Sequence, residues 1–396
     1  MSATTEDRWA LWGHLEDRYR EVERPHRVLA LDGGGIRGII TLGVLEALER
    51  QLRDSEAGGS KAFRLCDYFD LIGGTSTGAI IAAGLARGMS VGEISDFYAQ
   101  FGDTAFARRK LWNRWQTLYG EGGLAKTLKA TFEEDTTLRP EHLRCVLVVV
   151  TRNATTDSAW PISSNPFAKY NDPHRADCNL DIPLWKLVRA STAAPVFFPP
   201  EVVEWDPNNP EKSFVFVDGG TTPYNNPAFL LFRMATEPAY KLGWPTGEDN
   251  LLVVSVGTGS APVIGDSAEA PATNLLEAAS NTLSALMSQA SVDQDVNCRI
   301  IGRCCHGEMI DREVGDLIRD ELVEADTGGG REKLFRYVRY NATLTEGGLK
   351  KLGLERLNPV ELRKMDVVDN ADDLALVGTE VGKQVELKHL GSFVRA

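Results

Sequence analysis

The chain has 396 residues, 43% apolar and 25% charged, a composition that excludes disordered and collagen-like proteins. Its net charge of −13 and pI near 5.1 make nucleic acid an unfavourable partner. The N-terminus lacks the basic and apolar regions of a signal peptide, and no apolar run approaches the ~18 residues of a membrane span. The six cysteines are typical of reduced core thiols, so we expect a cytoplasmic protein.

After a polar helical leader over residues 1–26, two segments share one pattern: a short apolar run, a glycine-rich loop and a helix. Runs of this kind followed by helices favour a parallel sheet covered by helices. In chain order these segments are strand 27–32, loop 33–35, helix 36–52, strand 68–73, loop 74–78 and helix 79–87.

Further apolar runs predict strands at 143–151, 214–217, 251–256 and 334–340, and helices that begin at Pro183, Asn226 and Asn274. Irregular stretches at 103–123, 154–181 and 257–272 are long enough to form lids or binding loops. Three glycines at 328–330 predict a flexible hinge. We therefore expect a leader (1–26), one α/β domain (27–330) and a strand and helical extension (331–396) packed on the same domain.

The sharpest local pattern is the G-x-S-x-G sequence Gly74-Thr75-Ser76-Thr77-Gly78, between the second strand and its helix. This is the position of a nucleophile elbow, where two glycines let strand and helix pack around a turn that exposes the serine hydroxyl. The next backbone N–H then lies at a helix N-terminus and can stabilise an oxyanion. A purely structural turn is the alternative, and the strand and helix on either side favour a nucleophile.

A second pattern, Asp32-Gly33-Gly34-Gly35-Ile36-Arg37-Gly38, also matches the G-x-G-x-x-G fingerprint of dinucleotide-binding proteins. That fingerprint needs an acidic residue at the end of a second strand, whereas Asp54 and Glu56 lie in a polar stretch with no strand before them. The favoured interpretation is a loop of backbone N–H groups that binds an oxyanion or a phosphate, with positive potential from Arg37.

The third pattern is Asp218-Gly219-Gly220 at the end of the strand at 214–217. Ligands of open α/β sheets bind at the carboxyl ends of strands, although an aspartate before glycine can also simply form a turn. None of the six histidines follows a strand as a triad histidine does, and only His174 lies in a loop that could approach the site. The sequence therefore points to a dyad in which Asp218, made more basic by partial burial, takes the Ser76 proton.

Taken together, the motifs at 32–38, 74–78 and 218–220 resemble those of the patatin-like phospholipase family, and residues 190–195 and 225–227 look similar too. The resemblance covers roughly residues 27–260. It implies a three-layer α/β/α sandwich around a mainly parallel sheet. The residues after this motif-bearing part predict a helical C-terminal extension. The implied roles are Ser76 as nucleophile, Asp218 as base, Gly33, Gly34, Gly35 and Arg37 around the oxyanion hole, and Gly38, Gly74, Gly78, Gly219 and Gly220 as motif glycines.

The resemblance implies a phospholipase A type lipid acyl hydrolase that needs no cofactor or metal and meets phospholipid at a membrane surface. An alternative within the family is an effector of bacterial anti-phage defence, which a cyclic nucleotide would activate as a small-molecule partner. A non-catalytic lipid-binding protein on the same scaffold is a third interpretation, and the intact Ser76 and Asp218 argue against it.

Two smaller features complete the sequence-based expectations. The aromatic and basic stretch at 106–119 suits contact with a lipid surface, and a helix whose tryptophans pack inward is the alternative. The cluster Cys298, Cys304, Cys305 and His306 lacks the spacing of a zinc knuckle, so we expect buried helix thiols there.

Overall fold

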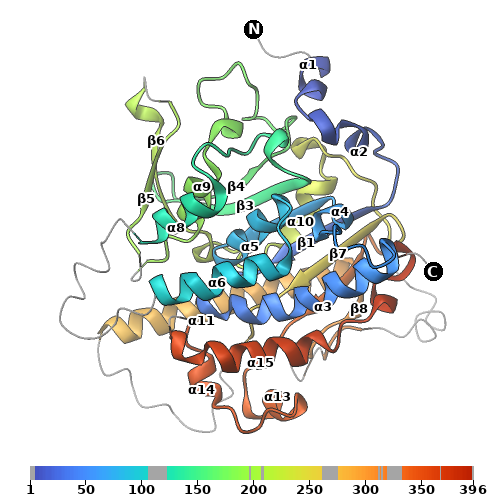
Figure 1. Cartoon of the computed structure of the whole chain (residues 1–396), viewed down its shortest axis with the longest axis vertical. Helices are drawn as coiled ribbons and strands as arrows, with labels where there is room; N and C mark the ends of the chain where they lie inside the picture. The colour runs from blue at the N-terminus through green and yellow to red at the C-terminus, as the bar shows by residue number, and fades with distance from the viewer. Residues whose placement is uncertain are drawn as a thin grey trace.

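The computed structural model describes residues 5–105, 123–195, 198–206, 209–260, 275–310, 313, 315–318, 332–365 and 367–394. Figure 1 shows strands through the middle of the molecule with helices around them. The helices of this part of the chain are α1 (Thr5–Ala10), α2 (Glu16–Arg20), α3 (Gly38–Glu56), α4 (Leu65–Tyr68), α5 (Thr77–Ala86), α6 (Val91–Ala105), α8 (Gly123–Phe132), α9 (Leu184–Ser191), α10 (Ala228–Thr236), α11 (Leu275–Ile301), α13 (Glu346–Lys351), α14 (Pro359–Leu362) and α15 (Ala371–Gly382).

One mixed sheet lies at the centre of the described part of the chain. Its strands follow the order β5-β6-β3-β2-β1-β7-β9-β8, with β4 paired to β3. They are β1 (His26–Leu31), β2 (Leu71–Thr75), β3 (Val146–Asn153), β4 (Ser158–Ser163), β5 (Glu201–Glu204), β6 (Ser213–Asp218), β7 (Leu251–Val256), β8 (Arg303–His306) and β9 (Arg336–Tyr340).

Strand pairing brings the three sequence motifs to one edge of the sheet. The pairs from β3 through β2, β1, β7 and β9 to β8 are parallel, so these strands end at a common edge. The pairs that join β3 to β4, β3 to β6 and β6 to β5 are antiparallel. Thr75 at the end of β2 pairs with Val150, and Asp218 at the end of β6 pairs with the next residue, Thr151. The residue after Thr75 is therefore level with Asp218.

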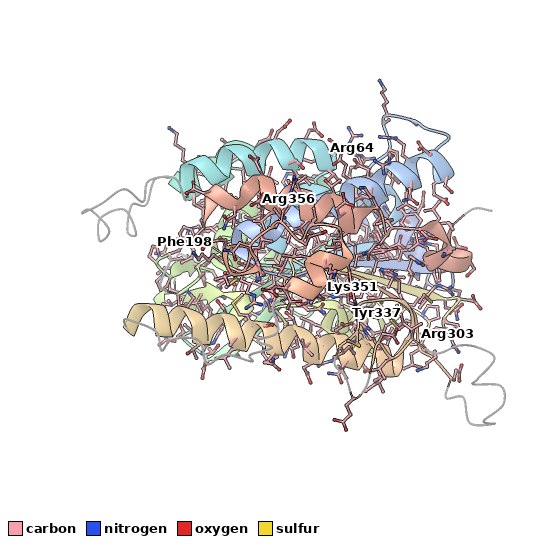
Figure 2. The ribbon with its side chains drawn as sticks, turned by 90° about the horizontal axis from the view of Figure 1, so that it is seen from below. Arg64, Phe198, Arg303, Tyr337, Lys351 and Arg356 are labelled. Atoms are coloured by element: carbon pink, nitrogen blue, oxygen red, sulfur yellow. The ribbon has the colours of Figure 1, made fainter. Side chains whose placement is uncertain are left out.

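Helices cover both faces of this sheet. Side chains alternate between the two faces along each strand, and both faces are apolar. Leu29 and Leu31 belong to one apolar cluster with residues of α3, α5, α6, α8, α9 and α15. Val28 and Ala30 belong to a second cluster with residues of α10, α11 and the N-terminal helices. Figure 2, turned by 90°, shows α11 on one side of the strands and α3 and α6 on the other. The fold is a three-layer α/β/α sandwich around a mainly parallel sheet, as the sequence predicts.

The part of the chain after residue 332 contributes to this core. Strand β9 pairs in parallel with β7, and Val338 and Tyr340 are fully buried. Helix α15 lies along α3, the helix that follows the first glycine loop (Figure 1), with Gly378 against Gly43. The predicted division at residues 26 and 330 stays a proposal.

A buried carboxylate holds the N-terminal segment at the opposite edge, where β1 and β2 begin. Asp70 Oδ1 accepts hydrogen bonds from Arg18 Nε at 3.0 Å and Arg24 Nη2 at 2.7 Å. The Arg27 N–H donates to Oδ2 at 2.9 Å. Burial alone raises the pKa of Asp70, but the neighbouring His26 ring and the charges of Arg18 and Arg24 outweigh burial and hold this pKa well below its ordinary value.

Some sequence-based expectations differ from the structure. Strand β4 lies inside the stretch expected to be irregular, and the described segments also include β5 and β8, which the sequence did not predict. Cys298 lies in α11 as expected, but Cys304 and Cys305 lie in β8 and not in a helix. Neighbouring residues of a strand face opposite sides, so Cys304 joins one apolar cluster and Cys305 packs against the other.

Three expectations fall on residues outside the described ranges. They are the aromatic and basic stretch at 106–119, residues 261–272 of the third irregular stretch and the glycine hinge at 328–330. Across the ranges that are described, no helix combines the length and apolar character needed to span a membrane.

Candidate active site

Ser76 lies at the sharp turn between β2 and α5. Its backbone has φ 54° and ψ −121°, a conformation that residues with a side chain rarely adopt. A Cβ at Gly74 would lie 2.1 Å from the Gly78 carbonyl oxygen, and one at Gly78 would lie 2.3 Å from the Leu31 carbonyl oxygen. Only glycine at these two positions lets the strand and helix backbones approach so closely. The turn has the strained strand-to-helix geometry of a nucleophile elbow.

Asp218 is the hydrogen-bond partner of the Ser76 hydroxyl. Ser76 Oγ donates to Asp218 Oδ2 at 2.5 Å, and the Gly220 N–H donates to Oδ1 at 2.7 Å. Ser76 is 7% exposed and Asp218 is 2% exposed, so water screens this contact weakly. The structure therefore brings together the two residues, 142 positions apart, that the sequence analysis paired.

The surroundings of Asp218 make it a stronger base than an ordinary aspartate. Burial raises the pKa of Asp218 to about 6, although the hydrogen bonds from Ser76 and Gly220 and the charge of Arg189 act in the opposite direction. A carboxylate with this pKa is ionised at neutral pH and accepts a proton more readily than one with the ordinary value of 3.8. The pair is thus suited to proton transfer from the serine hydroxyl.

The end of α9 holds both members of the pair, a contribution to which the sequence analysis gave no role. The Ser76 N–H donates to Ser191 Oγ at 2.9 Å, and the Ser191 hydroxyl donates to the Val150 carbonyl oxygen at 2.7 Å. The Asp218 N–H donates to the Ala193 carbonyl oxygen at 2.9 Å. The run of small residues at 190–195 was the available signal, because small side chains allow this close approach.

The glycine loop after β1 lies against the elbow. A Cβ at Gly33 would lie 3.3 Å from Ser76 Cβ. The Gly33 N–H already donates to the Asn225 carbonyl oxygen at 3.0 Å. Within the described ranges the N–H groups of Gly34 and Gly35 have no acceptor, and Gly35 has φ 61° at the start of the 3-10 turn Gly35–Arg37. These two amides, rather than that of Gly33, are the candidate oxyanion donors.

Other motif residues frame the loop and the aspartate. Gly38 begins α3 beside Thr77, and Gly219 lies against the Val150 carbonyl oxygen. Arg37 is half-buried; burial lowers its pKa to about 10, against the opposing effect of the Asp32 charge, so the guanidinium is charged at neutral pH. Arg37 Nε lies 3.5 Å from the Gly34 carbonyl oxygen, which puts a positive charge next to the loop.

The alternatives raised by the sequence find no support in this geometry. No histidine in the described ranges is hydrogen bonded to Ser76 or Asp218. The backbone N–H of His174 donates to Asp172 within its own loop. Asp54 and Glu56 lie inside helix α3, not at the end of a strand where a dinucleotide fingerprint needs its acidic residue.

A sequence model described as patatin-like phospholipase matches residues 29–232, which contain the glycine loop, Ser76 and Asp218. The chain belongs to this family. The matched segment ends within α10, so α11, the last three strands and the helices beyond β9 lie outside it.

Individual patatin-like proteins are similar at a moderate level. A Vibrio cholerae serotype O1 protein described as a cGAMP-activated phospholipase is 31% identical over 259 residues, which cover 61% of this chain and 66% of that protein. Patatin-2-Kuras 1 of Solanum tuberosum is 30% identical over 247 residues, covering 59% and 62%. The chain therefore spans slightly less than two thirds of these relatives. The solved structure of VipD from Legionella pneumophila aligns with 94% of this chain and 68% of its own at 15% identity, with a TM-score of 0.37.

Proposed function

We propose that the protein is a phospholipase A type lipid acyl hydrolase in which Ser76 is the nucleophile and Asp218 the general base. The observation that carries this proposal is the 2.5 Å hydrogen bond from Ser76 Oγ to a buried carboxylate whose pKa burial raises to about 6. The strained turn at Ser76 supports it, and so do the Gly34 and Gly35 amides, which have no acceptor within the described part of the chain. Membership of the patatin-like phospholipase family supports a lipid ester as the substrate, met at a membrane surface.

The reaction proceeds through two acyl-transfer steps. In the first, Asp218 takes the Ser76 hydroxyl proton while Oγ attacks the ester carbonyl carbon, and the protonated Asp218 then donates that proton to the leaving alcohol. In the second, Asp218 takes a proton from water, the water oxygen attacks the acyl carbon, and the proton returns to Ser76 Oγ as the fatty acid leaves. In both steps the Gly34 and Gly35 amides stabilise the oxyanion, and Arg37 adds positive potential.

The direct test compares Ser76→Ala with a matched control, Ser392→Ala. The Ser392 hydroxyl donates to Asp249 Oδ1 at 3.0 Å. We expect Ser76→Ala to abolish hydrolysis of phosphatidylcholine vesicles and of a p-nitrophenyl acyl ester, with an unchanged circular dichroism spectrum. Ser392→Ala should keep wild-type rates. Retained hydrolysis in folded Ser76→Ala contradicts the proposed nucleophile.

A second function is favoured by one comparison, the relative described as a cGAMP-activated phospholipase. We propose as the alternative that this chain is an effector of bacterial anti-phage defence whose hydrolysis a cyclic nucleotide activates. Phospholipid hydrolysis measured with and without cGAMP tests it. A rise of at least about tenfold supports the effector, and equal rates with and without the nucleotide support a constitutive hydrolase.

A lipid-binding scaffold without turnover is the remaining alternative. A fluorophosphonate probe labels only a serine that is activated as a nucleophile. Labelling of the wild type that disappears in Ser76→Ala supports the hydrolase. Binding to phosphatidylcholine vesicles without labelling supports the scaffold.

A further inference from the structure

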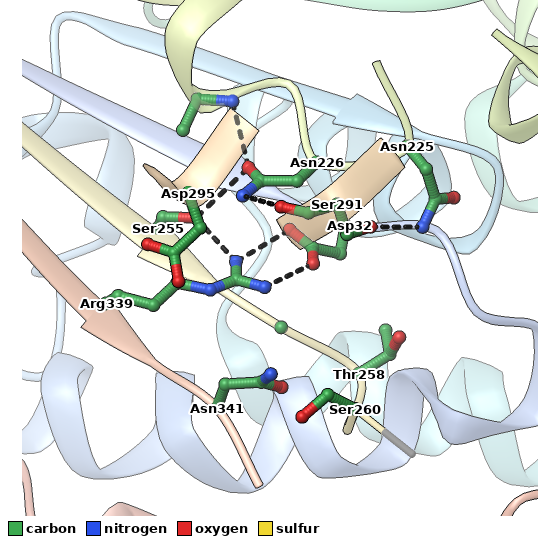
Figure 3. Close-up of polar contacts among 12 residues, drawn as sticks. Asp32, Asn225, Asn226, Ser255, Thr258, Ser260, Ser291, Asp295, Arg339 and Asn341 are labelled. Carbon is green, nitrogen blue, oxygen red and sulfur yellow. Dashed lines mark hydrogen bonds and ion pairs between the residues drawn. The ribbon is translucent and has the colours of Figure 1, made fainter. Parts of the chain in front are cut away.

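We propose that Arg339 is a positioning residue: acting through Asp32, it holds the glycine loop, and with it the Gly34 and Gly35 amides, in place against the turn at Ser76. This inference rests on the proposed function, and it gives a role in the reaction to strand β9, which lies outside the family match. Figure 3 shows the arginine and the aspartate facing each other.

The contact between the two residues is a buried bidentate ion pair. Asp32 directly follows β1 and directly precedes Gly33. Arg339 Nη1 donates to Asp32 Oδ1 at 2.8 Å, and Nη2 donates to Oδ2 at 2.6 Å. Both side chains are 4% exposed. Two parallel hydrogen bonds fix the orientation of the carboxylate as well as its position, which a single contact does not.

Arg339 reaches Asp32 across an intervening strand. β9 pairs with β7, where Ser255 is the partner of Arg339, and β7 in turn pairs with β1. On the way, Nη1 also donates to Ser255 Oγ at 2.6 Å (Figure 3). The guanidinium therefore connects three neighbouring strands at the edge where the glycine loop begins. Its hydrogen bond to Ser255 of β7 helps to orient it toward the Asp32 carboxylate.

The other anchors of the loop hold the residues on either side of the two oxyanion donors. The Gly33 carbonyl oxygen accepts from Thr258 Oγ1 at 2.9 Å. The Ile36 N–H donates to the Met365 carbonyl oxygen at 3.0 Å. Asp32, Gly33 and Ile36 are thus restrained on either side of the Gly34 and Gly35 amides, which have no acceptor among the described residues. Arg339 supplies the charged contact among these restraints.

This placement predicts which kinetic quantity changes when Arg339 is replaced. The oxyanion charge develops in the transition state that leads to the tetrahedral intermediate and is absent from the bound ester, so a misplaced loop weakens transition-state binding and leaves ground-state binding unchanged. If the ion pair serves stability alone, replacing Arg339 should lower the midpoint of unfolding and leave normal turnover in the fraction that remains folded.

The test compares Arg339→Met with Arg336→Met. Arg336 lies on the same strand, and its Nε donates to the His389 carbonyl oxygen at 2.9 Å, away from the loop. Rates with p-nitrophenyl butyrate and rates of fluorophosphonate labelling are normalised to folded protein. For Arg339→Met we expect kcat and the labelling rate to fall by about 10- to 100-fold with KM within about threefold of the wild type. Arg336→Met should stay within about threefold in all three quantities.

Arg339→Lys keeps the proposal testable if Arg339→Met does not fold, because lysine keeps the charge and loses the bidentate geometry. Its kcat should fall with KM unchanged. A folded Arg339 variant with kcat within threefold of the wild type, or equal losses in the Arg336 and Arg339 variants, overturns the positioning role. Ser76→Ala is measured alongside: if it stays active, the proposed function itself fails, and if it is inactive while Arg339→Met resembles the wild type, only the role of Arg339 fails.

Discussion

Two buried aspartates at opposite edges of the same sheet have opposite electrostatic surroundings. Asp70 contacts Arg18 and Arg24 where β1 and β2 begin, and its pKa lies well below the ordinary value. Asp218 accepts hydrogen bonds from a hydroxyl and a backbone N–H at the other edge, and burial raises its pKa to about 6. They are 1% and 2% exposed, so the partners and not the degree of burial account for the difference.

The contrast separates a carboxylate that stabilises the fold from one that costs stability. The pKa of folded Asp70 is lowered, so its contribution is present above the unfolded pKa near 3.8 and is lost as the pH falls. The pKa of folded Asp218 is raised from 3.8 to about 6, so its contribution to stability is fully present below pH 3.8 and is lost as the pH rises through 6. At about 1.4 kcal/mol per pKa unit, ionised Asp218 costs about 3 kcal/mol at neutral pH.

The largest effect that tests this contrast is on turnover. Replacing Asp218 by asparagine removes the proposed proton acceptor, so we expect kcat for a p-nitrophenyl ester to fall by about 10³-fold or more. Asp70→Asn should leave the kcat of folded protein within about threefold. Steady-state kinetics on both variants decide, and a loss below tenfold for Asp218→Asn means that another group acts as the base.

The next effect is on stability at the Asp70 edge. Asp70→Ala leaves Arg18 and Arg24 without their carboxylate, and we expect a loss of about 3–5 kcal/mol in urea unfolding at pH 7, shrinking at pH 3. The surface pair of Asp181 with Arg139 is the control, and Asp181→Ala should cost less than about 1 kcal/mol. Equal losses in the two variants contradict a special role for the buried pair.

A change of opposite sign is expected at the Asp218 edge. Asp218→Asn removes a buried charge, so the variant should gain about 3 kcal/mol over the wild type at pH 8. The gain should vanish near pH 4, where the wild-type carboxyl is protonated. Urea unfolding at the two pH values measures this. A variant with a lower free energy of unfolding than the wild type at pH 8 contradicts the inference that ionised Asp218 destabilises the fold.

A smaller effect concerns the residue that fixes the elbow. Ser191→Ala removes the acceptor of the Ser76 N–H, and we expect kcat to fall by about tenfold, which corresponds to about 1.4 kcal/mol. Thr192→Ala is the neighbouring control, because that hydroxyl donates to the Arg189 carbonyl oxygen within the same turn. Its kcat should stay within about threefold, and identical losses in both variants point to a general loosening of α9.

The smallest effect is a shift of the pH profile. The proposed mechanism requires ionised Asp218, so kcat/KM should rise with pH to a plateau, with a midpoint near pH 6. The charge of Arg189 lowers the pKa of Asp218, so Arg189→Met should move the midpoint to higher pH and change the plateau by less than about threefold. A midpoint that moves to lower pH contradicts this electrostatic coupling.

Sequence patterns predict the parts of this molecule whose cause is local. Strands such as β7 are buried on both faces and therefore appear as continuous apolar runs, and the glycines around Ser76 are required by a single turn. The meeting of Ser76 with Asp218 was predictable because both residues follow or end a strand. Strand β4 was not, because only its last two residues are buried and its periodicity is weak.

Supporting contacts between distant segments leave at most a weak local pattern, such as the small residues around Ser191. Ser191 supports the elbow from 115 residues away, and Arg339 meets Asp32 across 307 residues. A serine at the end of a helix and an arginine in a strand have many ordinary uses, so only the packed sheet shows which atoms they contact. The sequence therefore predicts the residues that form the site better than the residues that hold it in place.

The most direct test of the account is the position of the acyl group during turnover. Protein mixed with p-nitrophenyl butyrate and quenched in acid is digested and analysed by peptide mass spectrometry. We predict one butyryl adduct, on the peptide that carries Ser76, which is absent from Ser76→Ala and Asp218→Asn. An adduct on another residue, or turnover that persists in Ser76→Ala, contradicts the claim that Ser76 and Asp218 act together in ester cleavage.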